Sequence, residues 1–509
     1  MITNIIRAFV TLTFLSIILL SGCEDESIVS SSDTQLSKLI YVDCNAKSFF
    51  DFGTKEHPFK AIDKALSSAV EGSLLILAPG EYEIPNGELL LKAGVGIEGE
   101  DFYNTILKGD LIDENNSSLP LYINDITFDN LNFNRPLYSS NKYNEFIISN
   151  CKCNSIDVRF DSNDPATLYS FIIKNNDVTE KIYLHHGDGL WSNLNYIDNN
   201  RVRGGIYLEN GKKSIVYVDS NYVEGVIKNT NDIKTESYLR FNNVHGRIID
   251  SCEYWTDWAS NIIYKNKIFY EQYFPEAALA AIQHYGASIG ILDNQIHVIY
   301  GSAINLTVES YASLERNSIH IDHSYPNMDS SGVYYGIKII SNKCEIRENF
   351  IQGGDFGIYL NSQSSFVDHN QINSRLGNYI NSDGSFLNNV IYASEREALI
   401  VDGAAGNFSN NQFTGQTSSV KIVKAKNQLS NNVIDFGGGL LGSSGGNVFS
   451  SETGFNMIVE SSYSDVETIF AKYNKWNHNT ESEIDQFDIF DGKDQPGLSI
   501  VSFIPFSEQ

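Results

Sequence analysis

A short phrase of one polar and one apolar position recurs along most of the chain. Between Cys344 and Gly415, an Asn is followed two residues later by an aliphatic or aromatic residue every 19 to 22 residues. The asparagines of this phrase are Asn176, Asn200, Asn221, Asn242, Asn266, Asn294, Asn317, Asn349, Asn370, Asn389, Asn411, Asn432 and Asn447. A period of this length predicts a solenoid, in which each repeat is one coil of a single elongated domain.

The alternation of inward and outward positions around the phrase predicts coils of parallel β-strand. Parallel strands stack about 4.8 Å apart, so equivalent positions form columns along the axis. We expect the asparagines to form one column, in which each side chain hydrogen-bonds the next and the Asn also occupies the left-handed corner of its coil. Two residues later we expect an inward column from Val178 to Phe449 that includes Ile434, followed by an outward column that includes Asp435.

The stretch from Leu39 to Ile84 departs from the repeat. Ile40–Val42 and Leu74–Ala78 have the apolar character of buried strands, and Pro58–Ala69 has the spacing of an amphipathic helix. Because the open end of a solenoid exposes its core, we expect this helix to cap the N-terminal end.

This opening stretch resembles that of right-handed parallel β-helix proteins of the pectate-lyase type, in particular the group with a DUF1565-type N-terminal segment. The matching residues are Tyr41, Val42, Gly53, Thr54, Pro58, Phe59, Ile62, Ala65, Ala69, Gly72, Ile76, Pro79, Gly80 and Tyr82, and near the other end Asn474, Trp476, Asp491, Gly497, Val501, Phe503 and Pro505 are similar to that group's closing segment. The resemblance implies an all-β, pectin-lyase-like solenoid over residues 39–509, with the cap and first coils in 39–110 and a closing segment in 470–509. It implies no particular reaction, since the matches lie in cap and turn positions.

Residues 1–22 have the features of a secretion signal. Arg7 precedes an apolar run, Ala8–Leu20, which is too short to span a bilayer with ease and ends in Leu20-Ser21-Gly22-Cys23. This ending resembles the lipobox of bacterial lipoproteins, which implies cleavage before Cys23 and diacylation of its thiol. Residues 23–38 would then form a lipidated, Ser-rich flexible tether.

The triplet Glu24-Asp25-Glu26 is similar to signals that send lipoproteins of Bacteroidetes to the cell exterior. The resemblance implies an outer-membrane lipid anchor, as the only membrane attachment, and a position at the cell surface.

The formal net charge of -27 narrows the classes of partner. Nucleic acids and anionic membrane surfaces need a basic footprint, so we expect neither to be the main partner. Calcium is the one cofactor left open, since the acidic charge suits it although no EF-hand or DxDxDG pattern is present. The five cysteines after Cys23 have no metal-site spacing, so we expect them to be buried free thiols. We also expect the protein to be a monomer.

The outward column that follows the inward one contains three of the ten histidines, His245, His297 and His320. The expected substrate-binding residues on the same face are Arg201, Arg203, Glu224 and Lys267. Uronate β-elimination needs a group that neutralises the carboxylate and a base that takes the neighbouring proton. We therefore hypothesise that the cationic residues bind carboxylates and that one of the three histidines is the catalytic base; the alternative is that all are solvated outward positions.

Two coils carry extra residues directly after the phrase, in Phe269–Gly286 and His320–Gly336. Insertions in a solenoid leave the coil as loops, here from the same corner, and such loops commonly build the site. The aromatic candidates for stacking sugar rings in these loops and in the preceding EYWTDW stretch are Trp255, Trp258, Tyr273 and Tyr325, for which packing is the alternative.

Two classes of function remain open. The first is an enzyme that cleaves an acidic polysaccharide by β-elimination, and the second is a non-catalytic surface lipoprotein that binds or displays a glycan. Glycoside hydrolysis is disfavoured: His185-His186-Gly187-Asp188-Gly189 resembles the Gly-His-Gly of polygalacturonases, but the acidic residues that should precede it are absent. Since β-helices host both roles, the fold alone does not decide.

Overall fold

In the computed structural model the first strand begins at Lys38, and the chain from there to Gln509 folds as a continuous stack of strands. The structure describes residues 38–113, 121–135, 144–160, 169–186, 194–210, 214–231, 235–252, 260–271, 279–299, 301–322, 333–403, 405–424, 433–460 and 468–507. One hydrophobic core cluster extends from Ile40 to Phe503, so this unit contains a complete core of its own. The predicted signal, Cys23 and the tether up to residue 37 lie outside the described residues, whereas Lys38, predicted as the last tether residue, begins the first strand.

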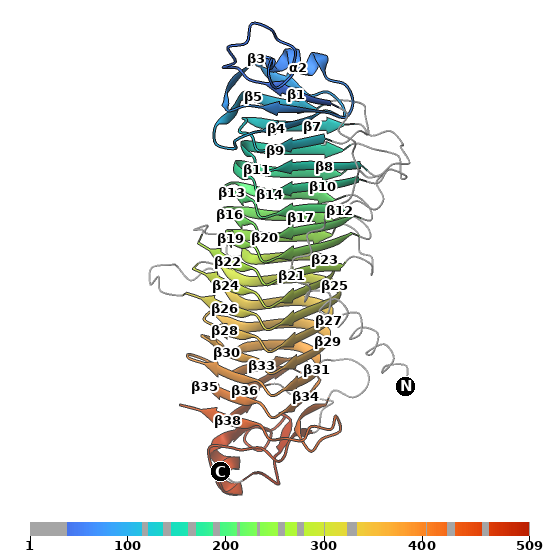
Figure 1. Ribbon diagram of the computed structural model, residues 1–509. Helices are drawn as coiled ribbons and strands as arrows, with labels where there is room; N and C mark the ends of the chain where they lie inside the picture. Colours follow the sequence, from blue (N-terminus) through green and yellow to red (C-terminus); the bar gives the residue numbers. More distant parts are fainter. Residues whose placement is uncertain are drawn as a thin grey trace. The chain divides into compact units, whose positions relative to one another are not determined.

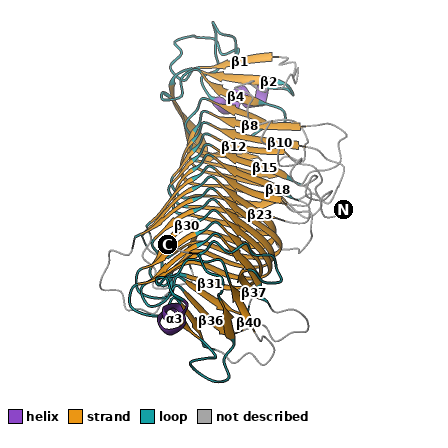
Figure 2. Cartoon of the chain, turned by 90° about the horizontal axis from the view of Figure 1, so that it is seen from below, coloured by secondary structure: helices purple, strands orange, loops and turns teal. Residues whose placement is uncertain are grey.

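The strands stack in three rows in which every pairing between coils is parallel, which confirms the predicted all-β parallel solenoid (Figures 1 and 2). The first row contains β1 (Lys38–Val42), β2 (Ser73–Leu77), β4 (Gly96–Gly99), β6 (Leu121–Asn124), β8 (Asn144–Ser149), β10 (Tyr169–Lys174), β12 (Leu194–Asp198), β15 (Ile215–Asp219), β18 (Glu236–Arg240), β21 (Ser260–Tyr264), β34 (Gly406–Ser409), β37 (Ile434–Gly437), β40 (Thr468–Ala471) and β42 (Ile500–Ser502).

The second row consists of short strands. They are β13 (Arg201–Val202), β16 (Tyr222–Val223), β19 (Asn243–His245), β22 (Lys267–Tyr270), β24 (Gln295–Val298), β26 (Ser318–Ile321), β28 (Phe350–Gln352), β30 (Gln371–Ser374), β32 (Val390–Ala393), β35 (Gln412–Gly415) and β38 (Val448–Ser451). Inward positions along this row are buried and outward ones are partly or fully exposed, as period-two alternation predicts.

The third row contains β3 (Gly80–Leu90), β5 (Thr105–Asp113), β7 (Asn130–Arg135), β9 (Lys152–Phe160), β11 (Asp177–His186), β14 (Gly205–Asn210), β17 (Val226–Asn231), β20 (Arg247–Cys252), β33 (Leu399–Asp402), β36 (Val420–Lys424), β39 (Met457–Val459) and β41 (Ile489–Phe490). Five long strands continue from the third row into the first row of the next coil: β23 (Ala280–Leu292), β25 (Ser302–Glu315), β27 (Tyr335–Arg347), β29 (Phe356–Asp368) and β31 (Asn378–Leu387). The short helical turns α3 (Glu481–Glu483) and η1 (Ile484–Asp488) lie in the closing segment.

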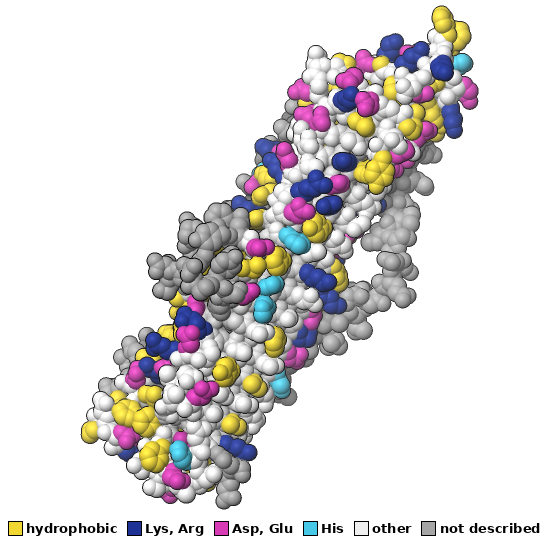
Figure 3. All heavy atoms as spheres, turned by 90° about the vertical axis from the view of Figure 1, so that its left-hand side faces the viewer, with side chains coloured by type: hydrophobic (Ala, Val, Ile, Leu, Met, Phe, Trp, Pro, Cys, Tyr) yellow, Lys and Arg dark blue, Asp and Glu magenta, His cyan; other side chains and the backbone are white. Residues whose placement is uncertain are grey.

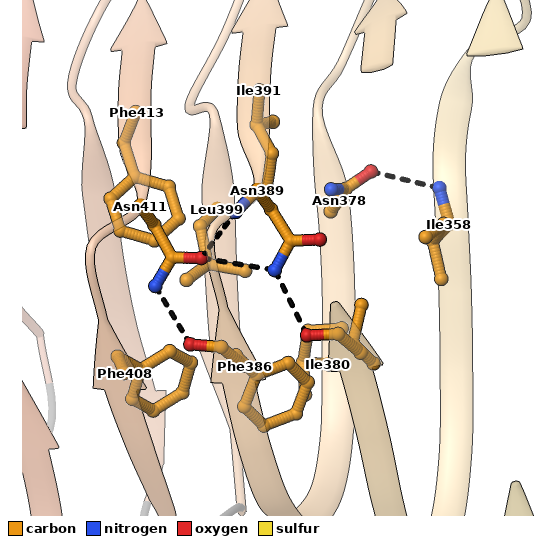
Figure 4. A pocket seen from close by; sticks show the side chains of 11 residues that line it. Ile358, Asn378, Ile380, Phe386, Asn389, Ile391, Leu399, Phe408, Asn411 and Phe413 are labelled. Carbon is orange, nitrogen blue, oxygen red and sulfur yellow. Dashed lines mark hydrogen bonds between the residues drawn. The ribbon is translucent and has the colours of Figure 1, made fainter. Parts of the chain in front are cut away.

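The predicted column of asparagines is confirmed as a continuous hydrogen-bonded ladder, and Figure 4 shows its rung between Asn389 and Asn411. In a typical rung, the backbone N–H and the side-chain amide of Asn389 both donate to Oδ1 of Asn411, at 3.0 and 2.9 Å, and the same amide donates to the carbonyl of Val367 at 3.0 Å. The pattern runs from Asn176 to Asn474. Each buried amide is thereby satisfied inside the core, where an unpaired polar group would be costly.

The left-handed corner falls one residue before the ladder, not on it. Positive φ occurs directly before each ladder asparagine, for example at Asn175 (57°), Arg316 (53°) and Glu348 (55°). The expectation that Asn serves the corner was therefore wrong. The backbone N–H of each ladder asparagine donates to the next Asn of the ladder. The corner position before it is occupied by many residue types, among them Asn175, Arg316 and Glu348.

One repeat was also placed wrongly. The backbone N–H and the amide of Asn411 donate directly to Asn447, so the ladder passes from Asn411 to Asn447, and Asn432 lies outside the described residues. Ile434 belongs to β37 in the first row, and Asp435 is buried, where it accepts hydrogen bonds from four backbone N–H groups. This coil is longer than its neighbours, so counting by the usual interval gave a false match.

The N-terminal helix, α2, is shorter than predicted and covers Ile62–Ser68. Phe59 instead forms a parallel bridge with Val42, so Pro58 and Phe59 continue the strand layer before the helix begins. Ile62, Ala65 and Leu66 of the helix pack into the core.

The cysteines match the sequence prediction. Cys44 is partly buried and Cys151, Cys153, Cys252 and Cys344 are buried, all as free thiols. Burial raises the pKa of Cys151 to about 12, so it stays a protonated, unreactive thiol. In the part of the chain that the structure describes, no helix is both long and apolar enough to cross a membrane.

A polar layer crosses the core between the third and first rows in the middle of the solenoid. His284 and Asp250 are both fully buried, with Nδ1 of His284 2.6 Å from Oδ2 of Asp250. The amides of Asn229 and Asn261 also donate to Asp250, at 2.6 and 2.7 Å. The carboxylate is thus held by three side chains from other strands.

Candidate functional site

The predicted outward histidines lie in one line on the second row. The register pairs His245 with Phe269, Phe269 with His297, and His297 with His320. Their ring centroids are 5.9, 5.1 and 5.1 Å apart, and Tyr222 extends the line at 5.2 Å from His245. We call these five residues the ring file. Figure 3 shows histidines on this side of the molecule, near its middle.

The three histidines of the ring file contact other rings rather than hydrogen-bonding partners. Among the described residues, no carboxylate or other polar group lies within hydrogen-bond reach of His245, His297 or His320. Nε2 of His297 is buried against the neighbouring rings and has no partner there. Within the described residues, the file therefore forms a stacking surface of rings in mutual contact.

The charged residues predicted around the file are partly compensated. Arg201 lies 3.6 Å from Glu224 and 5.7 Å from the centre of the Tyr222 ring. Arg203 lies 3.9 Å from Asp177. Lys267 is exposed beside Phe269, and within the described ranges it has no carboxylate within ion-pair distance. The carboxylates of Glu224 and Asp177 thus neutralise part of the positive charge that the sequence indicated for this face. Among the described residues, Lys267 beside the middle ring of the file has no such partner.

The two extra segments connect the second row to the third, as predicted from the spacing: β22 ends at Tyr270 and β23 begins at Ala280, while β26 ends at Ile321 and β27 begins at Tyr335. The residues predicted to stack sugars, Trp255, Trp258, Tyr273 and Tyr325, lie outside the described residues. Their role stays a prediction.

Sequence reasoning missed a hydrogen-bonded group on the third row. Oε2 of Glu209 accepts from the hydroxyl of Tyr183 at 2.7 Å and lies 2.8 Å from Nδ1 of His185. Arg159 lies 5.2 Å from the centre of the Tyr183 ring and is paired with Asp157 through Nε at 2.9 Å. This Tyr–Glu–His group combines a carboxylate, an imidazole and a phenol on a partly exposed face, which is a combination suited to moving protons.

The electrostatics of this group follow from its hydrogen bonds. Burial, and then the hydrogen bond to Glu209, raise the pKa of Tyr183 to about 12, so the phenol stays protonated near neutral pH. Burial alone would raise the pKa of Glu209, but the hydrogen bonds from Tyr183 and His185 outweigh it and lower the pKa. An ionised Glu209 in turn orients His185 through Nδ1.

The repeat itself contained the signal for this pair. His185 follows Asn176 by nine residues and Glu209 follows Asn200 by nine residues, so the two occupy the same position in successive coils. The group and the ring file lie on adjacent faces, because β11 pairs with β13 at Val178 and with β14 further on. The corner between these faces is tight: a Cβ on Gly204 would come within 1.8 Å of the carbonyl oxygen of Glu180.

Comparison with protein-family models and with curated proteins gives no match. Among solved structures, the chain is similar to the pectate lyase Pel9A (14% identity over 76% of this chain and 77% of that one, TM-score 0.22). It is also similar to the A-module of the mannuronan C-5 epimerase AlgE6 of Azotobacter vinelandii (11%, 67% and 92%, TM-score 0.24). A third is the catalytic unit of a GH87 α-1,3-glucanase of Streptomyces thermodiastaticus (10%, 80% and 68%, TM-score 0.25). At such low similarity, these matches add no argument about function, and the DUF1565 resemblance stays a prediction.

No three His, Cys, Asp or Glu side chains gather at one point to hold a metal ion in the described ranges. The structure therefore adds no support for the calcium that the acidic charge left open.

Proposed function

We propose that this protein binds an acidic polysaccharide that lies across the coils, over the ring file. The observation that carries the proposal is the unbroken line of five rings on an outward face, with Lys267, which has no carboxylate partner among the described residues, beside the middle ring. Sugar rings have apolar C–H faces that pack on aromatic rings, and a lysine beside them favours a carboxylate-bearing sugar.

We expect the double variant F269A/H297A to lower the affinity of residues 38–509 for a uronate polymer by about tenfold or more, since each ring contact is worth about 0.5–1.5 kcal/mol. Isothermal titration calorimetry against a panel of uronate polymers and a neutral polymer measures this. Tyr392, three coils beyond His320 in the same outward column, supplies the matched control Y392A, which should bind as the parent does.

K267A should weaken binding of the uronate polymers only. If the parent and F269A/H297A bind every polymer with equal affinity, the ring file is not the binding surface. If the parent binds neutral polymers as tightly as uronate polymers, it has no preference for acidic sugars.

Cleavage of the bound polymer by β-elimination is a second candidate function, favoured by the Tyr–Glu–His group. In this reaction a base removes the proton beside the uronate carboxyl, the glycosidic bond to the neighbouring carbon breaks, and a double bond forms between the two carbons. His185, oriented by Glu209, suits the base, and the protonated Tyr183 suits a donor to the leaving oxygen.

If the polymer is cleaved there, H185A and Y183F should each lower the rate of formation of the ultraviolet-absorbing unsaturated product by about 100-fold or more. H369A, at an exposed histidine on a distant coil, is the control and should retain the rate. Loss of activity in H297A or H320A with normal activity in H185A would instead locate the base in the ring file. Absence of product from every uronate polymer leaves the non-catalytic binder.

The lipid anchor at Cys23 and the cell-surface location belong to the same proposal and rest on the sequence alone. Mass spectrometry of the mature N-terminus decides whether Cys23 is the first residue and carries acyl chains.

A further inference from the structure

Three phenylalanines project from the loop that follows the first strand. The exposed fractions of Phe49, Phe50 and Phe52 are 94%, 52% and 64%. The rings contact one another rather than the core: Phe49 meets Phe50 edge-on at 5.6 Å, and Phe50 stacks on Phe52 at 5.4 Å. We call residues 43–58 the Phe loop. Apolar side chains exposed together in this way are uncommon on a soluble surface and mark an interaction site.

The Phe loop lies at the terminal edge of the solenoid. β1 pairs with β2 on one side only, and the loop covers its other edge: the Tyr41 N–H donates to the carbonyl of Gly53, and the Phe59 N–H donates to the carbonyl of Tyr41, both at 2.9 Å. The loop is also braced internally by the hydrogen bond between Ser48 Oγ and His57 Nδ1, at 2.8 Å. The three rings therefore protrude from a hydrogen-bonded support at the end of the stack.

Lysines flank the three rings. Lys47 and Lys55 lie within the Phe loop and Lys60 and Lys64 follow it, while the loop's own acidic residues, Asp43, Asp51 and Glu56, bring its net charge to +2 - 3 = -1. Figure 3 shows hydrophobic side chains at the upper end of the molecule with Lys and Arg next to them. Exposed aromatic rings flanked by lysines are the composition of protein segments that lie in the interfacial region of a bilayer.

The position of the loop in the chain points to the same partner. β1 begins at Lys38, and residues 23–37, which start at the predicted lipid anchor Cys23, join the solenoid there. Anything that holds the N-terminal segment at a membrane also brings this end of the solenoid to it. All three exposed rings are Phe, which enters the interfacial region of a bilayer without leaving a polar group unsatisfied.

We propose that the Phe loop is a membrane-docking surface, whose rings enter the interfacial region of a lipid bilayer and hold the solenoid by its N-terminal end. The glycan face proposed above lies along the side of the same solenoid, on β16 to β26, and would stay clear of the lipid. This inference does not depend on the polysaccharide, and it requires an apolar contact in addition to any acyl chain at Cys23.

The test uses residues 38–509, which contain the complete core but no predicted anchor, so that the loop is measured apart from the lipid. We expect this protein to sediment with vesicles of equimolar phosphatidylethanolamine and phosphatidylglycerol, and to remain bound at high salt because the contact is apolar. F49S/F52S should lower the partition coefficient by about tenfold or more for each ring removed. F487S removes an exposed Phe from the closing segment instead and should bind as the parent does.

Three results would overturn the proposal. The first is equal partitioning of F49S/F52S and the parent, and the second is binding that disappears at high salt, which would assign it to the lysines. The third is that the parent dimerises with increasing concentration in the absence of vesicles and F49S/F52S does not. The rings would then form an interface between two copies of this chain.

Discussion

H284A is expected to lower the free energy of unfolding by about 3–5 kcal/mol, because it removes one partner from a buried pair and leaves the carboxylate of Asp250 underpaired. Both side chains are fully buried, and their 2.6 Å contact is supported by amides from Asn229 and Asn261. The substitution also leaves a cavity where an imidazole was packed, which adds to the loss. Urea unfolding followed by circular dichroism measures the change.

The control for this variant is H369A. His369 is 59% exposed and lies 2.7 Å from Asp368, so its removal breaks a surface pair worth about 0–1 kcal/mol. If H284A and H369A unfold at the same denaturant concentration, the Asp250 layer does not stabilise the solenoid. H284L fills much of the cavity but supplies no donor, so a loss that persists in H284L is due to the missing hydrogen bond.

N389A is expected to cost about 2–4 kcal/mol, because it interrupts the asparagine ladder in the middle of the core. Oδ1 of Asn389 accepts from the backbone N–H and from the amide of Asn370, at 3.0 and 2.9 Å. Without Asn389 these buried donors lose their acceptor, and each unsatisfied buried group costs about 1–3 kcal/mol. The same unfolding experiment measures the loss.

Asn388, one residue earlier, is a matched control. It has φ of 54° at the left-handed corner, and its side chain donates to the surface carboxylate of Asp368 at 2.9 Å. Glycine accepts this backbone conformation, so N388G should change stability by a few tenths of a kcal/mol, about an order of magnitude less than N389A. Similar losses in N388G and N389A would mean that the corner, and not the ladder, holds the coil.

The ring file was predictable because its spacing is a property of the chain. His297 and His320 each follow a ladder asparagine by three residues, so any parallel stacking of the coils aligns them. The same spacing places His185 and Glu209 at equivalent positions of successive coils, but it does not predict that their side chains form a hydrogen bond. Side-chain contacts depend on the rotamers and on the bend of the strand at each corner.

The count failed where coil length changes. Asn432 has the sequence neighbours of a repeat, but the ladder passes directly from Asn411 to Asn447, which are 36 residues apart. The Asp250–His284 contact spans 34 residues and crosses one of the extra segments, so no interval of the repeat relates the two. An inserted loop leaves the periodic signal on either side intact while changing which residues meet across it.

For this protein, periodicity alone was sufficient for the parallel solenoid, the asparagine ladder and the line of outward histidines, because all three follow from stacking equal coils. The tertiary structure was needed for the pairing of Arg201 with Glu224, for the Tyr–Glu–His group and for the exposed Phe loop at the end of the stack. These depend on which side chains meet across strands and on which face is left uncovered, and local alternation of polar and apolar residues does not encode either.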